Sequence, residues 1–310
     1  MKRNRLFLLF LSISMFVSPH CSANDDNPTA VILPLKIMSY NIRHGEGMDK
    51  VFDLDRTAAV ISKHAPDIIG LQEVDSFVSR SNRINEMGYL ATKTSMHGTF
   101  GPAIPLTGGK YGVGILSKER PLSVNNIPLP GKEKRTLLVC EFEHYVFACT
   151  HLDLNDSCRK ASIPIIVEEA KRWTTKPFYI CGDWNDTPSS QTIAQIKRNF
   201  TLLNRTTNTS QFKCYTYPAD VPTKCIDYIA KYGKSSVPKT REVIDEPQAS
   251  DHRPIMVEIE LDITPEGINT LFVEHDAADQ DVYSLDGRRV NQPQAKGVYI
   301  VGKKKKYIVK

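Results

Sequence analysis

The chain has 310 residues, with 40 Lys and Arg against 35 Asp and Glu and a formal net charge of +5. The excess of basic residues lies in the two ends of the chain, so the part between them is close to neutral. That part holds roughly 240 residues, enough for one large α/β domain. Neutrality argues against an enzyme of long duplex DNA, because such enzymes usually carry a broad basic face.

The first 23 residues are typical of a secretory signal peptide. Basic residues precede an apolar stretch from Leu6 to Val17, and Cys21-Ser22-Ala23 offers small residues for cleavage. The stretch is short for a bilayer, so we expect no integral membrane span and an exported protein, whether periplasmic, cell-surface or secreted. Cleavage and lipidation at Cys21 would instead give a lipoprotein, and a buried N-terminal helix is the structural alternative. Residues 24–34 form a linker.

The main body, residues 35–263, begins with a strand over 35–42. A helix is predicted over 53–64, because Leu54, Ala58 and Ile61 recur at helical spacing, Asp53 can cap the start and Pro66 stops the end. Next come a short strand over 68–73, a surface helix over 81–89, and a long loop over 97–109 that is rich in Gly and Pro.

The rest of the main body mixes strands with two helices. Pro164 must start, kink or split the first of these helices. Strand pairs alternate with helices without a strict βαβ rhythm, which predicts mixed sheets packed together with helices outside. The predicted elements are strands over 111–117, 136–142 and 145–151, a helix over 158–173, a strand over 178–182, a helix over 189–196, and strands over 215–217, 225–230 and 255–261.

Cysteine placement predicts core positions and excludes one class of metal site. Cys140, Cys149 and Cys181 each lie in an apolar run and are expected in the core. Cys214 and Cys225 flank a connection that contains Tyr and Pro, and in an exported protein they can form a disulfide or remain two thiols. No Cys-x-x-Cys pair is present, so a zinc or redox site is not expected.

Residues 264–310 form a separate β-prone segment. Asp286-Gly287 and Gly302-Lys303 are turn signals between β-prone runs. The segment resembles the short C-terminal sorting-type β modules of exported bacterial proteins, which implies a small β structure used in export or surface retention. The alternative is a solvated tail that carries the lysine run at 303–306.

Six short polar clusters in the main body each follow or interrupt an apolar run. Polar groups at the ends of buried strands are how a β scaffold aims side chains into one cleft. Amides, carboxylates and imidazoles suit a hard divalent cation and a phosphate ester, which predicts a metal-dependent phosphoester hydrolase. The clusters contain Asn41, Glu73, His151, Asp183 with Asn185, Asp227, and Asp251 with His252.

Three of these residues are candidate metal ligands. Glu73 is the leading one, because a carboxylate at the end of an apolar strand is costly to bury without a partner. Asn41 offers a neutral oxygen, and Asp251 could face the same ion. In isolation, Glu73 would more often be a surface residue and Asn41 a turn cap.

The remaining cluster residues are candidate catalytic groups. Asp183 and Asn185 share one face of an extended segment, where Asp183 can take a proton from water and Asn185 can hold phosphoryl oxygens. Asp227 can orient His252, which is either a base or a phosphate stabiliser. His151 can reach a phosphate oxygen or the leaving group, although a lone strand-end histidine is more often structural.

Several further side chains could contact a substrate. Arg43, Tyr111 and Arg135 are candidate substrate-binding residues, and Arg80 and Arg83 are also potential anion contacts. Each arginine is more often an ordinary salt-bridge partner, and Tyr111 can equally be a core residue.

The ordered set of clusters resembles the endonuclease/exonuclease/phosphatase superfamily over residues 35–262, with all six motif positions filled. The resemblance implies an α+β fold, a four-layer αββα sandwich of two packed mixed sheets. It also implies Mg²⁺, with Mn²⁺ as an alternative. The Thr150-His151-Leu152 run is similar to the phosphatase and sphingomyelinase branches. The implied roles are metal binding by Asn41, Glu73 and Asp251, water activation by Asp183, phosphate contact by Asn185 and His151, and a His252–Asp227 pair.

These observations predict an exported, Mg²⁺-dependent hydrolase of a small phosphodiester or phospholipid head group. A secreted nuclease that acts on DNA or RNA is the second hypothesis. A catalytically silent binding module on the same fold is the third, and the complete set of polar clusters argues against it. The sequence leaves the oligomeric state open.

Overall fold

The computed structural model describes residues 32–205, 214–235 and 237–263 of the main body, together with short strands of the C-terminal segment. The predicted signal peptide, including Cys21, and most of the predicted linker lie outside the described residues. The chain separates into two compact units, Val31–Ile263 and a second unit that contains Thr264–Lys310.

The main body contains two mixed sheets. The strands of the first sheet are β1 (Ile32–Asn41), β2 (Ile68–Ser76), β3 (His97–Leu106), β4 (Gly109–Ser117), β11 (Thr240–Val243) and β12 (Ile255–Asp262). The strands of the second sheet are β5 (Ser123–Leu129), β6 (Arg135–Glu141), β7 (Val146–His151), β8 (Phe178–Asp183), β9 (Phe200–Leu202) and β10 (Asp227–Tyr232). Their orders are β11-β12-β1-β2-β4-β3 and β5-β6-β7-β8-β10-β9.

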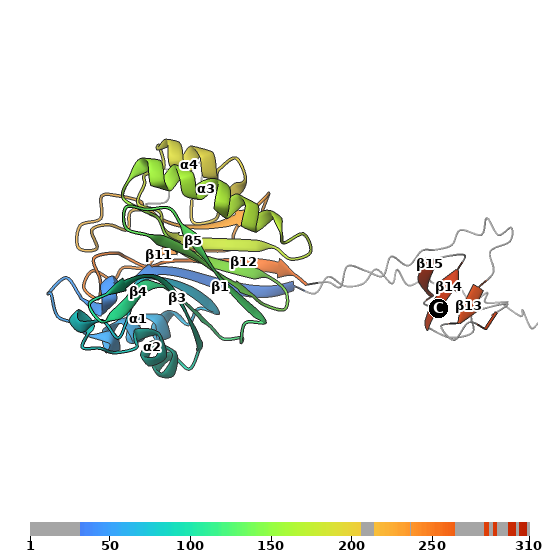
Figure 1. Cartoon of the computed structure of the whole chain (residues 1–310), viewed down its shortest axis with the longest axis horizontal. Helices are drawn as coiled ribbons and strands as arrows, with labels where there is room; N and C mark the ends of the chain where they lie inside the picture. Colours follow the sequence, from blue (N-terminus) through green and yellow to red (C-terminus); the bar gives the residue numbers. More distant parts are fainter. Residues whose placement is uncertain are drawn as a thin grey trace, which may run out of the picture. The chain divides into compact units, whose positions relative to one another are not determined.

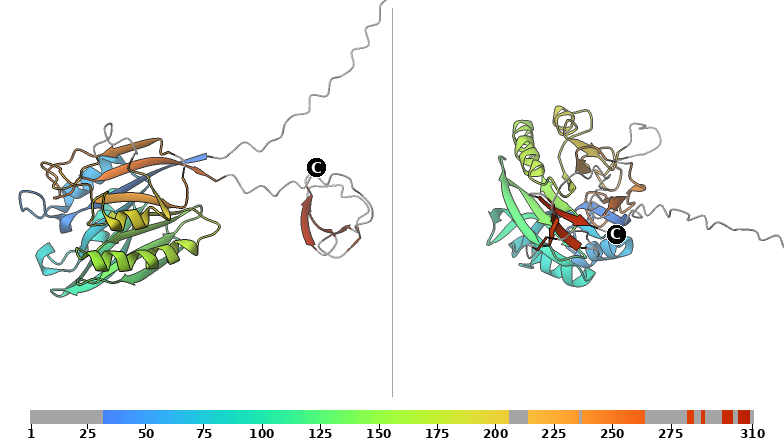
Figure 2. Two further views of the ribbon diagram at one scale, coloured as in Figure 1. Left: turned by 90° about the horizontal axis from the view of Figure 1, so that it is seen from above. Right: turned by 90° about the vertical axis from the view of Figure 1, so that its right-hand side faces the viewer.

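Helices cover the outer face of each sheet. They are α1 (Leu54–His64), α2 (Glu86–Thr94), α3 (Asp156–Lys171) and α4 (Gln191–Ile196), with short 3₁₀ turns at Arg43–Gly45 and Ser79–Ser81. Figure 1 shows α3 and α4 on one outer side and α1 and α2 on the other, with both sheets between them. The right-hand view in Figure 2 shows the same order of layers. The expected four-layer αββα sandwich is confirmed.

Three hydrophobic clusters fill the spaces between the four layers. The middle cluster joins the two sheets and includes Cys140, Cys149 and Cys181, which confirms their predicted core positions. Gly70 on β2 lies against two of these thiols. A Cβ atom at Gly70 would lie 2.2 Å from the Cys181 Sγ, so the absence of a side chain lets the two sheets approach.

The two longest helices follow their sequence signals. Asp53 caps α1 by accepting hydrogen bonds from the Asp55 and Arg56 amides, and the helix ends at His64, followed by the C-cap Ala65 and then Pro66. Asn155 caps α3, which runs through Pro164 as one helix and is neither started nor split by it. We attribute this to burial of the helix face against the second sheet, which compensates for the hydrogen bond that proline cannot donate.

Several predicted elements differ from the structure. Residues 97–109, expected as a loop, contain β3 and the start of β4; the edge position of β3 and a bulge between Pro102 and Ile104 accommodate proline. The helix expected over 81–89 begins only at Glu86, after the Asn85 cap. The strand expected over 215–217 is reduced to a bridge at Tyr217, and the short strands β5, β9 and β11 were not predicted.

Glu86, at the start of α2, is a fully buried carboxyl group. Its Oε2 accepts a hydrogen bond from the Asp75 amide at 2.8 Å. Burial raises the pKa of Glu86 to about 9, from an ordinary value of 4.5, so folding takes up a proton between these pH values. The stability from this group is present at low pH and is lost as the pH rises toward the folded-state pKa.

We therefore expect Glu86→Gln to stabilise the protein more at pH 8 than at pH 5. The free energy of unfolding should rise by about 1–3 kcal/mol at the higher pH, because the variant no longer has a carboxyl group to ionise. Urea unfolding at both pH values measures the difference. An equal change at the two pH values would contradict a protonated Glu86.

The C-terminal segment contains a small antiparallel sheet, β13 (Val282–Ser284), β14 (Gly297–Val301) and β15 (Lys304–Ile308), in the order β13-β14-β15. This confirms its β character. The predicted turns at 286–287 and 302–303 lie outside the described residues, and a role in sorting stays a prediction.

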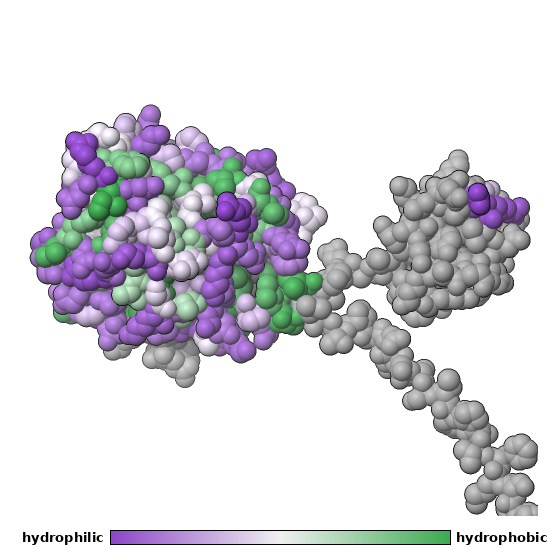
Figure 3. Space-filling model, turned by 90° about the horizontal axis from the view of Figure 1, so that it is seen from below, coloured by the Kyte–Doolittle hydropathy of each residue, from purple (hydrophilic) through white to green (hydrophobic). Residues whose placement is uncertain are grey.

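The surface of the main body is mixed in character. On the face shown in Figure 3, hydrophobic residues form small areas separated by hydrophilic ones, as is usual for a folded domain. Within the part of the chain that the structure describes, no helix is long and apolar enough to cross a membrane.

Candidate functional site

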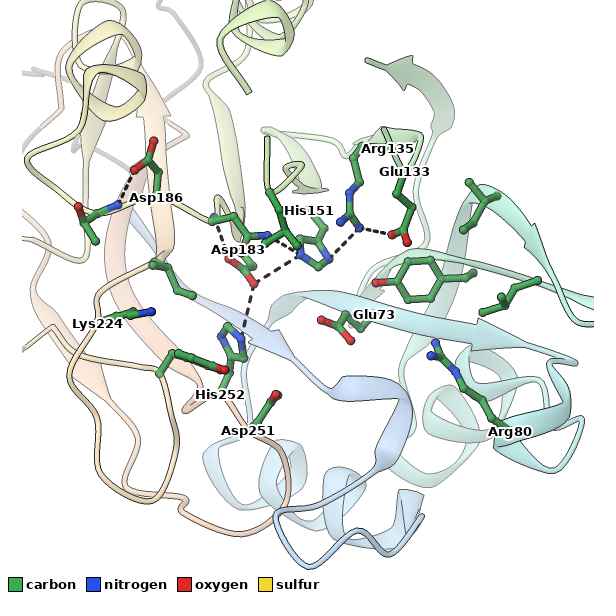
Figure 4. A pocket seen from close by; sticks show the side chains of 18 residues that line it. Glu73, Arg80, Glu133, Arg135, His151, Asp183, Asp186, Lys224, Asp251 and His252 are labelled. Atoms are coloured by element: carbon green, nitrogen blue, oxygen red, sulfur yellow. Dashed lines mark hydrogen bonds and ion pairs between the residues drawn. The ribbon is translucent and has the colours of Figure 1, made fainter. Parts of the chain in front are cut away.

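The predicted polar clusters converge at one edge of the sandwich. β1 runs parallel to β2 and β7 parallel to β8, so their carboxyl ends meet at this edge. β12 and β10 run antiparallel to β1 and β8, so their first residues arrive at the same place. The result is a cleft of about 670 Å³, a size suited to a small molecule. Its lining includes Glu73, His151, Asp183, Asn185, Asp251 and His252 (Figure 4).

Glu73 reaches the cleft through an irregularity in β2. The register of β2 against β4 shifts between Gln72 and Val74, and Glu73 has a left-handed φ of 59°. Such a bulge interrupts the alternation of side chains between the two faces of the sheet and redirects one of them. The left-handed backbone that it requires is strained, and strained residues are often found at functional sites. Burial raises the pKa of the Glu73 carboxyl, the Asn41 hydrogen bond opposes this, and Asp251 adds to it.

Asn41 lies behind the cleft and connects its two halves. Its side-chain amide donates to Glu73 Oε1 and to Asp183 Oδ2, both at 3.1 Å, while its Oδ1 accepts from the Arg43 amide. The side chain is fully buried. Asn41 therefore holds carboxylates from the two sheets side by side.

Asp183 is the central carboxylate of the site. It lies at the end of β8, directly opposite Asp227 in the register with β10. Its Oδ1 accepts from the Asn185 amide at 2.9 Å. Burial raises the pKa of Asp183 to about 7, His252 opposes the rise, and Asp227 adds to it. A carboxylate with this pKa can exchange a proton near neutral pH.

His252 lies between two buried carboxylates. Its Nδ1 is 2.9 Å from Asp227 Oδ2, and its Nε2 is 3.6 Å from Asp183 Oδ2. Burial alone would lower the pKa of His252, but Asp227 and Asp183 outweigh that effect and raise it to about 10. Thr216 Oγ1 also donates to Asp227 Oδ2 and so helps to fix this carboxylate.

His151 lies on the other side of Asp183, with its Nε2 3.5 Å from Asp183 Oδ2 (Figure 4). The Asn185 side-chain amide is 2.9 Å from the same Nε2 and also donates to the Leu152 carbonyl. Burial lowers the pKa of His151, and Arg135 and His252 lower it further, so the ring is neutral. Asn185 has a left-handed φ of 50°, a second strained backbone position in the site.

The three predicted substrate-binding residues have different surroundings. Arg135 and Tyr111 line the cleft, and Arg135 Nη1 lies 2.9 Å from Glu133 Oε1. Arg43 is not among the lining residues and pairs with Glu46 at 3.3 Å and Asp251 at 3.6 Å. A substrate contact by Arg43 stays a prediction, as do those of Tyr111 and Arg135.

The donor set fits a hard divalent cation. Glu73, Asp251 and Asn41 offer carboxylate and amide oxygens, and burial of the Glu73 carboxyl, which raises its pKa, would favour a bound cation. A second group, Asp183, Asp227 and His252, has ligand atoms within 4.8 Å of one another. Both ring nitrogens of His252 face carboxylates, which favours an imidazolium with no lone pair for a metal. We therefore favour the first set.

Arg80 and Lys224 line the cleft but are outside the predicted catalytic, metal-binding and substrate-binding sets. Arg80 follows β2 and was predicted only as a potential anion contact or a salt-bridge partner, and Lys224 precedes β10 and gave no signal in the sequence. Both line the cleft, and Figure 4 shows them on opposite sides of the central histidines.

Cys214 and Cys225 are both buried in the same hydrophobic cluster, and the structure shows both as free thiols. The Arg205 guanidinium also contacts the Cys225 Sγ at 3.8 Å. A disulfide between the two cysteines stays a prediction.

Comparison with known proteins gives one family. The model of the "Endonuclease/Exonuclease/phosphatase family" matches residues 38–252. No curated protein matches the sequence.

Solved structures share the fold. An endonuclease/exonuclease/phosphatase from Bacteroides vulgatus is 21% identical, with a TM-score of 0.61 and coverage of 74% of this chain and 99% of that one. A mannosyl-6-phosphatase from Bacteroides thetaiotaomicron is 18% identical, with a TM-score of 0.58 and coverage of 72% and 98%. D. rerio TDP2 in complex with a single-strand DNA product is 17% identical, with a TM-score of 0.57 and coverage of 73% and 98%.

The family match extends from the first polar cluster to the last, and the site geometry agrees with it. The chain belongs to the endonuclease/exonuclease/phosphatase family, whose members are phosphoesterases and nucleases.

Proposed function

We propose that the protein is an exported, Mg²⁺-dependent hydrolase of a small phosphodiester or phospholipid head group. The observation that carries this proposal is the convergence of Glu73, Asp183 and His252 in one cleft, although they lie far apart in the sequence. A bound Mg²⁺ would polarise a phosphoryl oxygen and offset the charge that develops on it. Glu73, Asn41 and Asp251 would hold the ion.

Asp183 would take a proton from the attacking water. Its raised pKa supports this role, because a base works best when its pKa lies near the working pH. Asn41 and the Asn185 amide hold the carboxylate in a fixed orientation by hydrogen bonds to its two oxygens. Asn185 and neutral His151 would contact the phosphoryl oxygens by exchanging the hydrogen bond that now joins the Asn185 side-chain amide to His151 Nε2.

His252 is better suited to stabilise phosphate than to act as a base. The carboxylates of Asp227 and Asp183 keep its pKa well above neutral pH, so the ring carries a positive charge when the enzyme works. An imidazolium donates hydrogen bonds to an anionic phosphoryl group and has no lone pair for a proton. This supports one of the two roles that the sequence left open.

A nuclease is the second candidate function. The D. rerio TDP2 structure contains a single-strand DNA product, and its fold is shared with this chain. The near-neutral charge of the main body argues against long duplex DNA, because little counterion release would be gained. The mannosyl-6-phosphatase on the same fold supports a small substrate.

Metal removal tests the proposed chemistry. We expect chelation by EDTA to lower activity at least about 100-fold and added Mg²⁺ to restore it, because the ion supplies charge stabilisation that no side chain replaces. A panel of phosphomonoesters, phosphodiesters, sphingomyelin and plasmid DNA, assayed with Mg²⁺ and with Mn²⁺, identifies the substrate class. Activity that survives exhaustive chelation would contradict the proposal, and cleavage of plasmid DNA at low enzyme concentration would favour the nuclease.

Export can be tested independently of catalysis. We expect the mature chain, analysed by mass spectrometry after expression in a bacterial host, to begin after Ala23. A lipid-modified chain that begins at Cys21 would support the lipoprotein alternative. Retention of Met1 in the extracytoplasmic fraction would contradict cleavage of a signal peptide.

A further inference from the structure

Arg80 is built rigidly into the wall of the cleft. Its Nε lies 2.8 Å from Asp75 Oδ2 and its Nη2 lies 3.0 Å from Asp75 Oδ1. Asp75 itself is completely buried and is fixed by the hydrogen bond from its amide to Glu86. The Arg80 guanidinium also lies over the Tyr111 ring, 5.5 Å from its centroid. The Nε–Nη2 edge of the guanidinium is therefore occupied by Asp75, and one of its faces is covered by Tyr111.

The Nη1 end of the Arg80 guanidinium is the part that faces the open cleft. Within the described residues, Arg80 Nη1 makes no hydrogen bond, and the side chain is 41% exposed. Arg80 lines the cleft beside Glu73, and Figure 4 shows its guanidinium directed toward that carboxylate and into the cleft. An arginine that a buried carboxylate orients in this way presents a planar set of donors, the geometry that suits a phosphate or carboxylate group.

We propose that Arg80 binds a second anionic group of the substrate, separate from the phosphoryl group that is cleaved. The preferred substrate is then a small phosphoester that carries an additional phosphate or carboxylate on the Glu73 side of the cleft. This inference rests on the proposed function, since it concerns the same site. Arg80 is a specificity-determining residue and takes no part in proton transfer.

Lys224 provides a matched comparison on the opposite wall. Its Nζ lies 5.7 Å from the centroid of the Tyr217 ring, and that ring packs against His252 with centroids 4.9 Å apart. Within the described residues Lys224 has no carboxylate partner. Lys224→Met removes one positive charge from the same cleft without touching the Asp75–Arg80 pair, so it reports the general effect of charge.

Kinetics with paired substrates tests the assignment. The pairs are fructose 6-phosphate with fructose 1,6-bisphosphate, glycerol 3-phosphate with 3-phosphoglycerate, and the dinucleotide d(TpT) with d(pTpT). They add one phosphate or one carboxylate to a monoester or a diester. We expect the wild-type enzyme to prefer the more highly charged member of at least one pair by about 10-fold or more in kcat/KM, as a charge-assisted hydrogen bond allows. The pair that shows the preference identifies phosphate or carboxylate as the second group.

Two variants then assign the preference to Arg80. Arg80→Met should lower kcat/KM for the preferred member by about 10- to 100-fold, mainly through KM, and that for its partner by less than about threefold. Arg80→Lys keeps a charge beside Asp75 and preserves the fold if the Met variant does not, but it loses the planar donors and should also lose most of the preference. Thermal unfolding of both variants checks the fold.

The outcomes separate this inference from the proposed function. Equal losses on both members of a pair, or a preference that disappears in Lys224→Met and survives in Arg80→Lys, would overturn the role of Arg80. Hydrolysis of both members with equal efficiency by the wild-type enzyme would also overturn it, while leaving the proposed function intact. No hydrolysis of any phosphoester by the wild-type enzyme would overturn both.

Discussion

Replacement of Asp183 with Asn is expected to lower kcat by about 1,000-fold, within the range that general base catalysis contributes. The asparagine oxygen can still accept from the Asn185 backbone amide, as Asp183 Oδ1 does at 2.9 Å, but its NH2 group cannot accept the hydrogen bond that Asn41 donates to Asp183 Oδ2. The variant therefore loses the group that can take a proton from water and one of the two hydrogen bonds that orient it. Loss of one carboxylate should also lower the pKa of His252, which now depends on both Asp183 and Asp227.

The pH–rate profile provides the decisive measurement for this variant. In the wild-type enzyme, activity should rise with pH as the Asp183 carboxyl, whose pKa is raised by burial, loses its proton. The rise should disappear in the Asn variant. Asp156→Asn, an exposed position in the first turn of α3, is the matched control and should keep its activity. An Asp183→Asn enzyme within about tenfold of wild type would show that another group activates the water.

Replacement of Glu73 with Gln is expected to lower kcat/KM by about 100-fold or more at a fixed Mg²⁺ concentration. Glutamine keeps the shape of the side chain and one oxygen, but it has no charge to attract the ion. In the metal-free protein the same change should leave stability equal or higher at pH 8. The reason is that burial raises the pKa of Glu73 and makes its ionised form unfavourable in the folded state.

Metal-dependent stability separates loss of the ion from loss of the fold. Mg²⁺ at about 100 times its dissociation constant should stabilise the wild-type protein by about 2.7 kcal/mol, whereas the Glu73→Gln variant should respond only at much higher concentration. Glu168→Gln on the exposed surface of α3 is the matched control. An unchanged Mg²⁺ response in the Glu73 variant would show that the ion lies elsewhere, and Asp183, Asp227 and His252 would then be the next set to test.

The sequence was sufficient to single out the central polar residues of the cleft because each lies at or next to the end of a buried strand. A polar group that follows an apolar run is conspicuous, since burying it without a partner is unfavourable. Asp183 follows the apolar run at 178–182 and His151 follows the one at 145–150, so both could be identified in this way. The core positions of Cys140, Cys149 and Cys181 follow from the same local pattern.

The edge strand β3 shows where local patterns mislead. Its Gly and Pro residues resemble a loop, but pairing on one side only and a bulge between Pro102 and Ile104 let the segment join the first sheet. The short strands β5, β9 and β11 were missed for a related reason. Each is held by a neighbouring strand, and its own apolar periodicity is weak.

The sequence by itself predicted which polar residues meet in the cleft and that they lie at the ends of strands of a layered fold. Only the tertiary structure decided how they pair. The antiparallel register of β10 and β8 sets Asp227 opposite Asp183, and His252 enters between them from a third segment. The positions of Arg80 and Lys224 on facing walls were equally hidden. The pairing of these residues depends on contacts between distant parts of the chain, and such contacts cannot be predicted from local sequence propensity.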